Sequence, residues 1–241
     1  QRLLHFGSLK SGSLTFTGVE ISQSTDGTVF AGQPKYAKKL AEVPISELEF
    51  DKKGVVTKKS ETIFRGVIGA LLWLSVQTRP DLAFDVSYWA SHAGSATKET
   101  FGQLNKLVRR AKENADTTLI YRRVAKDWGD LRCYAFSDAG EGSRKSGLSQ
   151  AGSLILHGHH SGLDGAGISG NLLDSRSDKI TRSCRSSFRA ELEAMQASCD
   201  LLEATCFQIE DLSRNMNLHT WLTSYGRTDD VRAIIIDSKG L

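Results

Sequence analysis

The pattern of apolar and polar positions predicts helices in the front of the chain and strands in the back. Segment 13–33, SLTFTGVEISQSTDGTVFAGQ, alternates around Asp26 and Gly27, a pair typical of tight turns, and predicts a β-hairpin. Pro34 favours the first turn of a short helix through KYAKKLAEV. The polar residues of segment 44–61 then indicate a solvated loop.

Three segments with helical patterns follow. ETIFRGVIGALLWLSVQ predicts a mostly buried helix, and RPDLAFDVSYWASHAG predicts a helix that begins at Pro80 and ends at Gly94. In TKETFGQLNKLVRRAKEN, Thr97 is a suitable N-cap and the apolar residues recur at helical spacing. These apolar residues are Phe101, Leu104, Leu107, Val108 and Ala111.

Strand patterns begin after residue 130. LRCYAFSD alternates, which places Tyr134, Phe136 and Asp138 on one face. SGLSQAGSLILHG and GISGNLLDSRS predict two further strands, and segment 187–212 predicts a long helix. The expected buried seam of this helix consists of Phe188, Leu192, Met195, Cys199, Leu202, Cys206 and Ile209. VRAIIID is nearly all apolar and predicts a strand buried on both faces.

These elements predict an α/β protein of the α+β kind with two units. Residues 1–126 combine a hairpin, a loop and helices, whereas residues 127–241 have the order strand, strand, strand, helix, strand. That order predicts a mixed sheet with one long helix.

Composition is that of an ordinary globular protein, with 39% hydrophobic and 24% charged residues among 241. The longest uncharged apolar stretch, segment 66–76, is too short to span a bilayer, and no signal peptide opens the chain, so we expect neither a membrane nor secretion. The four cysteines show no C-x-x-C spacing and predict reduced, mostly buried thiols. Because Gln1 is not Met, we expect a piece of a longer protein.

Charge is unevenly distributed. Residues 1–128 hold 19 Lys and Arg against 13 Asp and Glu, and the remainder holds 12 against 15. A basic front suits a nucleic acid, although plain surface charge explains so small an excess equally well. Arg109, Arg110 and Lys112 lie off the apolar stripe of their helix and are candidates for phosphate contacts, with a solvated helix face as the alternative.

Three acidic residues occupy the ends of elements in the back part. Asp138 ends the first strand, Glu191 lies in the first turn of the long helix, and Asp237 ends the last strand. If they converge, cations must offset their repulsion, and carboxylate oxygens suit Mg²⁺ or Mn²⁺. Two such ions could support in-line attack of water on a phosphodiester. The alternative is ordinary turn chemistry for the Asp residues and a favourable helix dipole for Glu191.

A second group of possible ligands is LHGHHSG, which contains His157, His159 and His160. Two of these histidines could bind zinc, but no cysteine or acid stands at ligand spacing nearby in the sequence. A polar loop is the simpler interpretation.

Several motifs resemble the pol polyprotein of copia-type LTR retrotransposons. FRGVIGALLWLSVQTRPDLAFDV is the most specific match, and FGSLKSGSLTFTGVEIS, PKYAKKLAE and TKETFGQLNKLVRRAKE resemble neighbouring segments of that family's reverse transcriptase. YAFSDAG, SSFRAELEA and IIIDSKGL resemble the motifs of its ribonuclease H domain. The resemblance covers nearly the whole chain.

The resemblance implies the reverse-transcriptase end, with its thumb and connection helices, joined to a ribonuclease H-like sheet. It gives Asp138, Glu191 and Asp237 the roles of catalytic metal ligands for two ions. It further implies an RNA–DNA hybrid as substrate, the rest of the polyprotein as partner, no small-molecule cofactor, and a location in cytoplasmic virus-like particles or the nucleus.

Departures from the family pattern keep a second reading open. Gly140, Glu141 and Gly142 stand where the family has a tryptophan and a second aspartate, and Arg189 replaces a glutamate. No Tyr-x-Asp-Asp polymerase motif is present, and the fold's fourth carboxylate is expected beyond Leu241. The alternative is therefore a catalytically silent remnant that binds nucleic acid weakly at most.

Overall fold

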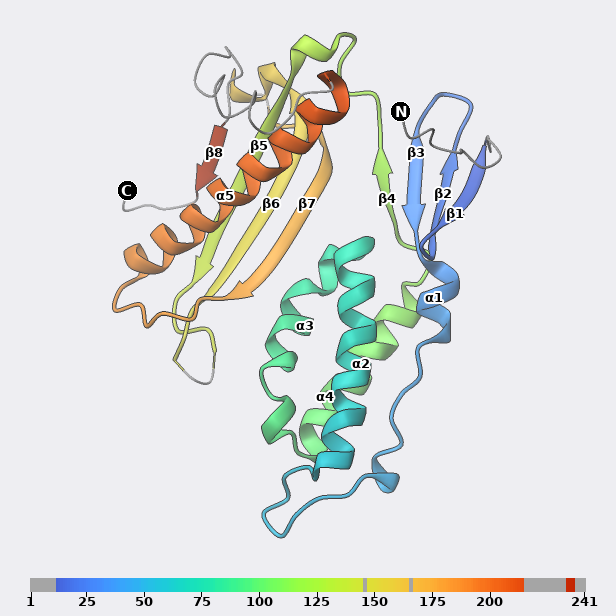
Figure 1. The fold of residues 1–241 in the computed structure, drawn as a ribbon, viewed down its shortest axis with the longest axis vertical. Helices are drawn as coiled ribbons and strands as arrows, with labels where there is room; N and C mark the ends of the chain where they lie inside the picture. The colour runs from blue at the N-terminus through green and yellow to red at the C-terminus, as the bar shows by residue number, and fades with distance from the viewer. Residues whose placement is uncertain (1–11, 145–146, 165–166, 215–232, 237–241) are drawn as a thin grey trace, which may run out of the picture.

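The computed structural model describes residues 12–144, 147–164, 167–214 and 233–236. It has an α+β fold made of a front unit, in which a small sheet adjoins a group of helices, and a back unit, in which a long helix crosses a second sheet (Figure 1). Among the described helices, none combines the length and apolar character needed to cross a bilayer.

The front unit contains an antiparallel sheet with the order β1-β2-β3-β4 and the helices between β3 and β4. Its strands are β1 (Ser13–Phe16), β2 (Val19–Gln23), β3 (Val29–Gly32) and β4 (Thr118–Tyr121). Its helices are α1 (Pro34–Lys39), η1 (Ile45–Glu47), α2 (Lys58–Gln77), η2 (Pro80–Leu82), α3 (Ala83–Ala90), η3 (Ala93–Ser95) and α4 (Lys98–Glu113).

The core of the front unit forms where α2, α3 and α4 pack together. Thr97 caps α4 as predicted, because its hydroxyl accepts a hydrogen bond from the Thr100 amide. All five residues of the predicted apolar stripe of α4 are buried. Phe101 meets Phe64 of α2 edge-on, with ring centroids 5.1 Å apart, and both side chains are fully buried. Burial of each such side chain contributes about 1.5–3 kcal/mol.

Arg79 joins the start of η2 to the end of α4 within this unit. Its side chain is buried and forms an ion pair with Asp81 at 2.7 Å, while Nη1 donates to the Asn114 carbonyl at 2.7 Å. Hydrogen bonds from Arg79 lower the pKa of the Asp81 carboxyl. The Arg-Pro-Asp motif therefore connects η2 to the C-terminal end of α4 through the buried Arg79 side chain.

Three predictions for the front unit were wrong in detail. The predicted hairpin is a three-stranded meander, because a turn at Thr17 and Gly18, both with positive φ, separates β1 from β2. Segment 44–61 is not simply solvated, since Phe50 and Val56 pack against the core and α2 already begins at Lys58. The helix α2 is buried on one face only, and its other face exposes Leu72, Trp73 and Val76.

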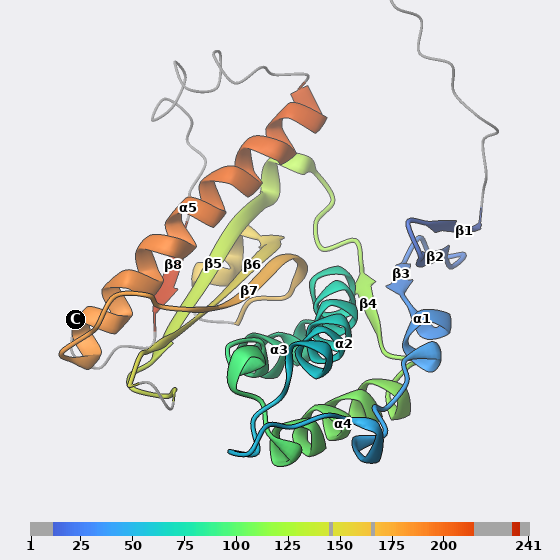
Figure 2. The same cartoon turned by 60° about the horizontal axis from the view of Figure 1, so that its bottom comes forward.

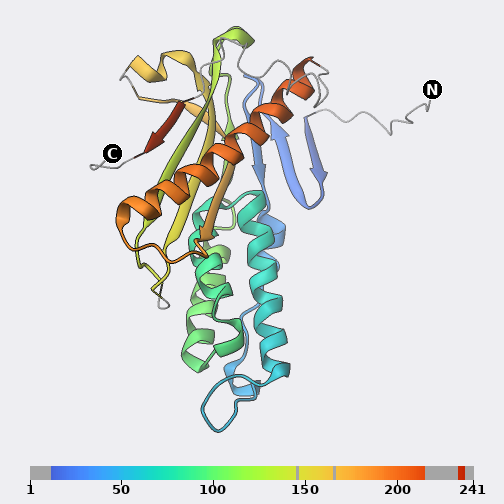
Figure 3. The same ribbon diagram turned by 60° about the vertical axis from the view of Figure 1, so that its left-hand side comes forward.

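The back unit contains a mixed sheet with the order β7-β6-β5-β8. Its elements are η4 (Trp128–Asp130), β5 (Leu131–Gly140), β6 (Gln150–His159), η5 (His160–Asp164), β7 (Gly170–Lys179), α5 (Ser187–Arg214) and β8 (Ala233–Ile236). The first three strands pair antiparallel, and β8 pairs parallel to β5 after α5 has crossed the sheet (Figure 3). The predicted order of elements is confirmed.

The helix α5 covers the sheet face that carries Cys133, Ala135 and Ile155. The predicted seam is correct at Leu202 and Cys206 but wrong in the first half of the helix, where Phe188 is 50% exposed and Ala190, Ala194 and Ser198 are fully buried instead. The first half of α5 packs through small residues against small residues of the sheet, among them Ala151 and Ser153. The helix therefore lies close to the strands, and larger side chains fit only at its flanks.

The strand β8 borders the described part of the sheet. It pairs parallel to β5, and Ile234 is 37% exposed, so the expectation of a strand buried on both faces was wrong. Ile234 pairs with Ala135 and so lies on the face that α5 crosses, whereas Leu154 of β6 pairs with Phe136 and is 44% exposed on the opposite face.

The two units meet along β7, on the side of the sheet away from α5 (Figure 2). Arg144, which follows β5, is buried and donates to the Ser87 hydroxyl at 2.8 Å, the Ser91 hydroxyl at 3.2 Å and Gln150 Oε1 at 2.6 Å. Gln150 in turn donates to Ser177 of β7 at 2.8 Å. One cationic side chain therefore connects α3 to two strands of the back unit, and its burial lowers its pKa.

We predict that Arg144→Ala lowers the free energy of unfolding by about 2–3 kcal/mol, because hydrogen bonds to a charged group are lost and polar partners stay buried. Urea denaturation measures the change. The matched control is Arg185→Ala, which removes an exposed arginine of the same unit and should change stability by less than about 0.5 kcal/mol. Equal stabilities of the two variants would exclude this role of Arg144.

Candidate functional site

Asp138 lies near the end of β5 and is exposed. Its neighbour Ser137 is buried and Ala139 packs with the cluster beneath α5, so the alternation of the strand turns Asp138 to the opposite face. Gly152 of β6 pairs with Asp138, and a Cβ there would meet only the Asp138 carbonyl oxygen, at 3.9 Å. The bare residues beside Asp138 therefore leave its carboxylate open to a ligand.

Glu191 lies near the start of α5 and is 9% exposed. Its neighbours Ala190 and Ala194 pack in one cluster with Ala139 and Ala151, the residues that follow Asp138 and precede Gly152. Glu191 consequently lies at the same end of the sheet as Asp138, on the α5 side. The helix α5 begins where β5 ends (Figure 1).

Glu193 is the other carboxylate of this part of α5. It pairs with Arg189 at 2.5 Å and with Arg182 at 3.6 Å, so two arginines already offset its charge. Glu191 is the more buried of the two and follows Ala190, which packs against the end of the sheet, so it stays the candidate ligand.

Asp237 lies outside the described residues. The strand before it is described, and its parallel register pairs Ser137 with Ile236, the residues that immediately precede Asp138 and Asp237 in the sequence. Two of the three predicted acids are thus placed at one end of the sheet, and β8 runs toward that end.

The predicted phosphate contacts lie on or near the last turn of α4. Arg109 pairs with Glu42 at 3.2 Å and Arg110 pairs with Asp85 at 2.7 Å. Both pairs are substantially exposed to solvent, and such pairs contribute little to stability, typically about 0–1 kcal/mol. Lys112 is exposed. The three residues therefore offer positive charge that a phosphate can reach.

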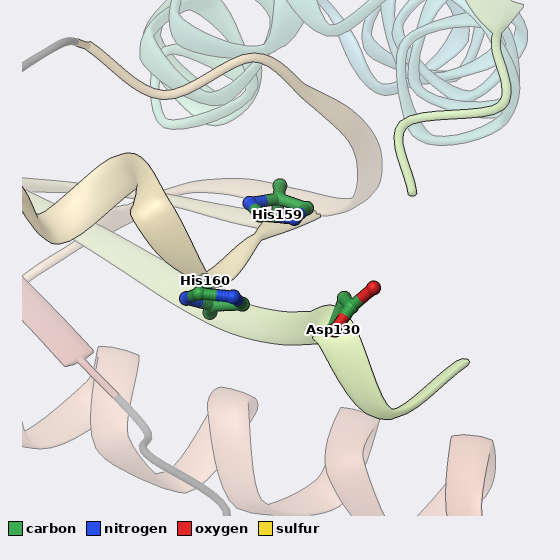
Figure 4. A group of neighbouring side chains, drawn as sticks. All are labelled: Asp130, His159 and His160. Carbon is green, nitrogen blue, oxygen red and sulfur yellow. The ribbon is translucent and has the colours of Figure 1, made fainter. Parts of the chain in front are cut away.

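The histidine group has an acidic neighbour that the sequence did not reveal. Asp130 of η4 lies beside His159 and His160, with one possible ligand atom from each residue within 4.8 Å of the others (Figure 4). The spacing of residues in the sequence did not reveal Asp130, because almost the whole β5–β6 hairpin separates Asp130 from His159. The pairing of two predicted strands was the only signal that could have found it.

Comparison with known proteins finds relatives among the transposon polyproteins of yeast. The chain is 24% identical to the Transposon Ty1-JR1 Gag-Pol polyprotein of Saccharomyces cerevisiae over 177 residues, which are 73% of this chain and 9% of that protein. The Truncated transposon Ty1-A Gag-Pol polyprotein of the same yeast matches equally well, with 14% of its length covered. The chain is similar to part of a transposon Gag-Pol polyprotein.

This similarity supports the kinship with copia-type retrotransposon polyproteins that the motifs implied. The chain spans about a tenth of the length of the full polyproteins it matches. No family model matches the chain, and no solved structure matches it.

His157 provides a test of burial in this histidine segment, because desolvation lowers its pKa below 6.5. The unfolded chain then binds more protons than the folded protein as the pH falls below about 6.5, so acid should reduce stability. We predict that the free energy of unfolding falls between about pH 7.5 and about pH 5.5, and that His157→Gln weakens this dependence. Denaturation at several pH values measures it; identical pH profiles for both proteins would contradict the prediction.

Proposed function

We propose that the chain is the end of a retrotransposon reverse transcriptase joined to a ribonuclease H-like unit that cleaves the RNA strand of RNA–DNA hybrids. The observation that carries the proposal is the β5–β8 register, which brings Ser137 beside Ile236 just before two acids, while α5 places Glu191 at the same sheet end. Three antiparallel strands, a crossing helix and a parallel fourth strand beside the first also form the order expected of a ribonuclease H fold.

The proposed site lies at the end of the sheet, where Asp138 from one face and Glu191 from the other would reach common ions around the ends of β5 and β8. Asp138, Glu191 and Asp237 would hold two Mg²⁺ or Mn²⁺ ions, and the donor set fits because these hard cations prefer carboxylate oxygen. The ions supply a metal-activated water and stabilise the departing oxygen. The protein contributes the spacing of the carboxylates, and the open surface around Gly152 leaves room for a nucleic-acid backbone.

Binding of the hybrid would draw on the basic front unit. Arg109, Arg110 and Lys112 would contact phosphates, and a phosphate can replace Glu42 or Asp85 as the partner of an arginine because both ion pairs are solvent-exposed. Contacts to phosphate give affinity without sequence preference. Preference for an RNA strand would come from its 2′-hydroxyl groups and the shape of the hybrid.

Replacement of the first proposed ligand tests the activity. We predict that, in a chain extended beyond Leu241 to supply the fourth carboxylate, Asp138→Asn reduces Mg²⁺-dependent cleavage of a labelled RNA–DNA hybrid by on the order of 10²–10³-fold, because a charge that positions the ions is removed. Glu193→Gln is the matched control, since it removes a nearby carboxylate paired with arginines, and its rate should stay near that of the unmodified chain. Equal cleavage by Asp138→Asn and the unmodified protein would remove Asp138 from the site, and no cleavage by either would favour a silent remnant.

Replacement of a basic residue tests hybrid binding separately. We predict that Lys112→Ala weakens binding of a short hybrid and lowers the slope of log affinity against log salt by about 1, as expected when one phosphate contact is lost. Fluorescence anisotropy at several salt concentrations measures both quantities. Lys53→Ala, an exposed lysine in the loop before α2, is the control and should leave the slope unchanged. The same slope for all three proteins would place the hybrid elsewhere.

A further inference from the structure

A group of mixed nitrogen and oxygen ligands lies at the opposite end of the β5–β6 hairpin from Asp138. Asp130 closes η4, His159 is the last residue of β6 and His160 opens η5. One possible ligand atom from each lies within 4.8 Å of the other two (Figure 4). Asp130 and His159 are half-buried and His160 is exposed, so an ion can enter from solvent.

The strand pairing fixes this arrangement. Leu131, the first residue of β5, pairs with His159, the last of β6, so Asp130 and His160 flank the open end of the hairpin. The Tyr134 hydroxyl donates to the His159 carbonyl at 2.7 Å and anchors the backbone between the two histidines. His159 is therefore held by the sheet, and Asp130 and His160 each lie one residue beyond its paired strands, which favours a defined site.

Contacts around His159 orient its ring. The Ser161 amide donates to His159 Nδ1 at 3.2 Å, and the Ser161 hydroxyl lies 2.8 Å from the same nitrogen. Hydrogen bonds to one ring nitrogen orient a histidine ligand. Because Nδ1 accepts from the amide here, coordination through Nε2 requires the other tautomer, in which Nδ1–H donates to the Ser161 hydroxyl and the amide contact is lost.

We propose that Asp130, His159 and His160 bind a first-row transition-metal ion such as Zn²⁺. Two imidazoles and one carboxylate suit such ions, whereas Mg²⁺ prefers oxygen ligands only. With Zn–N distances of about 2.0–2.1 Å, tetrahedral ligand atoms lie roughly 3.3 Å apart, so modest side-chain rotation must close the group. Three protein ligands leave a fourth position for water or a small ligand.

A pocket of about 400 Å³ adjoins this group and includes Asp130 and His159 in its wall. Segment 123–127, which leads from β4 toward η4, forms the rest of the wall and supplies Arg123 and Lys126. A bound ion would tie Asp130, three residues after this segment, to the end of β6, and the basic side chains would favour an anionic fourth ligand.

Metal titration tests the proposal. The untagged chain, first freed of metal with a chelator, is titrated with Zn²⁺ by calorimetry and with Co²⁺ by visible absorption. We expect one tight equivalent, a d–d band typical of four-coordinate Co²⁺, and at least about 10-fold weaker binding after His160→Ala or Asp130→Asn. Because His160 is exposed, its loss should leave the fold intact, and circular dichroism checks this.

One control variant locates the site. His157→Gln removes the other histidine of the same segment and should bind Co²⁺ with unchanged affinity. Binding to His160→Ala as tight as to the unmodified chain would overturn the proposal. So would an equal loss in His157→Gln, or full displacement of Co²⁺ by millimolar Mg²⁺.

Discussion

The close packing of α5 on β5 and β6 depends on small side chains on both surfaces. Ala190 and Ala194 meet Ala151 with Ala139 beside them, and the Ser198 hydroxyl shares a hydrogen bond of 2.6 Å with Ser153. A larger residue at any of these places would push the helix outward, and overpacking of this kind typically costs about 1–3 kcal/mol. The position of Glu191 relative to the end of β5 follows from this contact, and so does the geometry of any ion held there.

The sequence predicted the elements well where a period was strong. The α4 stripe, its Thr97 cap and the order of strands around α5 follow from local patterns, and the structure confirms them. Prediction from the sequence failed where the packing partner determines which side chains are buried. In α5 the predicted seam begins with Phe188, which is 50% exposed, whereas Ala190 and Ala194 are buried against the sheet. In α2 one face of the helix packs into the core, and Trp73 on the other face is partly exposed. Hydrophobicity alone does not show which face of a helix packs against another element.

The same limit applies to the candidate functional residues, of which some were predicted from the sequence and others were missed. Asp138, Glu191 and Asp237 were predicted as one site because each ends or begins a predicted element, and the structure describes the first two near the end of β5 and the start of α5. Asp130 was missed because its closeness to His159 arises from pairing across a whole hairpin. Arg144 was missed for a related reason: its partners Ser87 and Ser91 belong to another unit, and a buried arginine in a polar turn has no signature in sequence.

The parallel pairing of β5 with β8 joins residues about a hundred positions apart in the chain. The β5–β6–β7 meander can form from near neighbours, whereas β8 must wait until α5 has crossed the sheet, and such distant pairings form late because closing a long loop is costly in entropy. During synthesis, then, the acidic end of the sheet stays incomplete until the ribosome has passed residue 236. The nascent chain would carry a folded but unfinished sheet with an open β5 edge, a stage at which a chaperone or a neighbouring chain could pair with it.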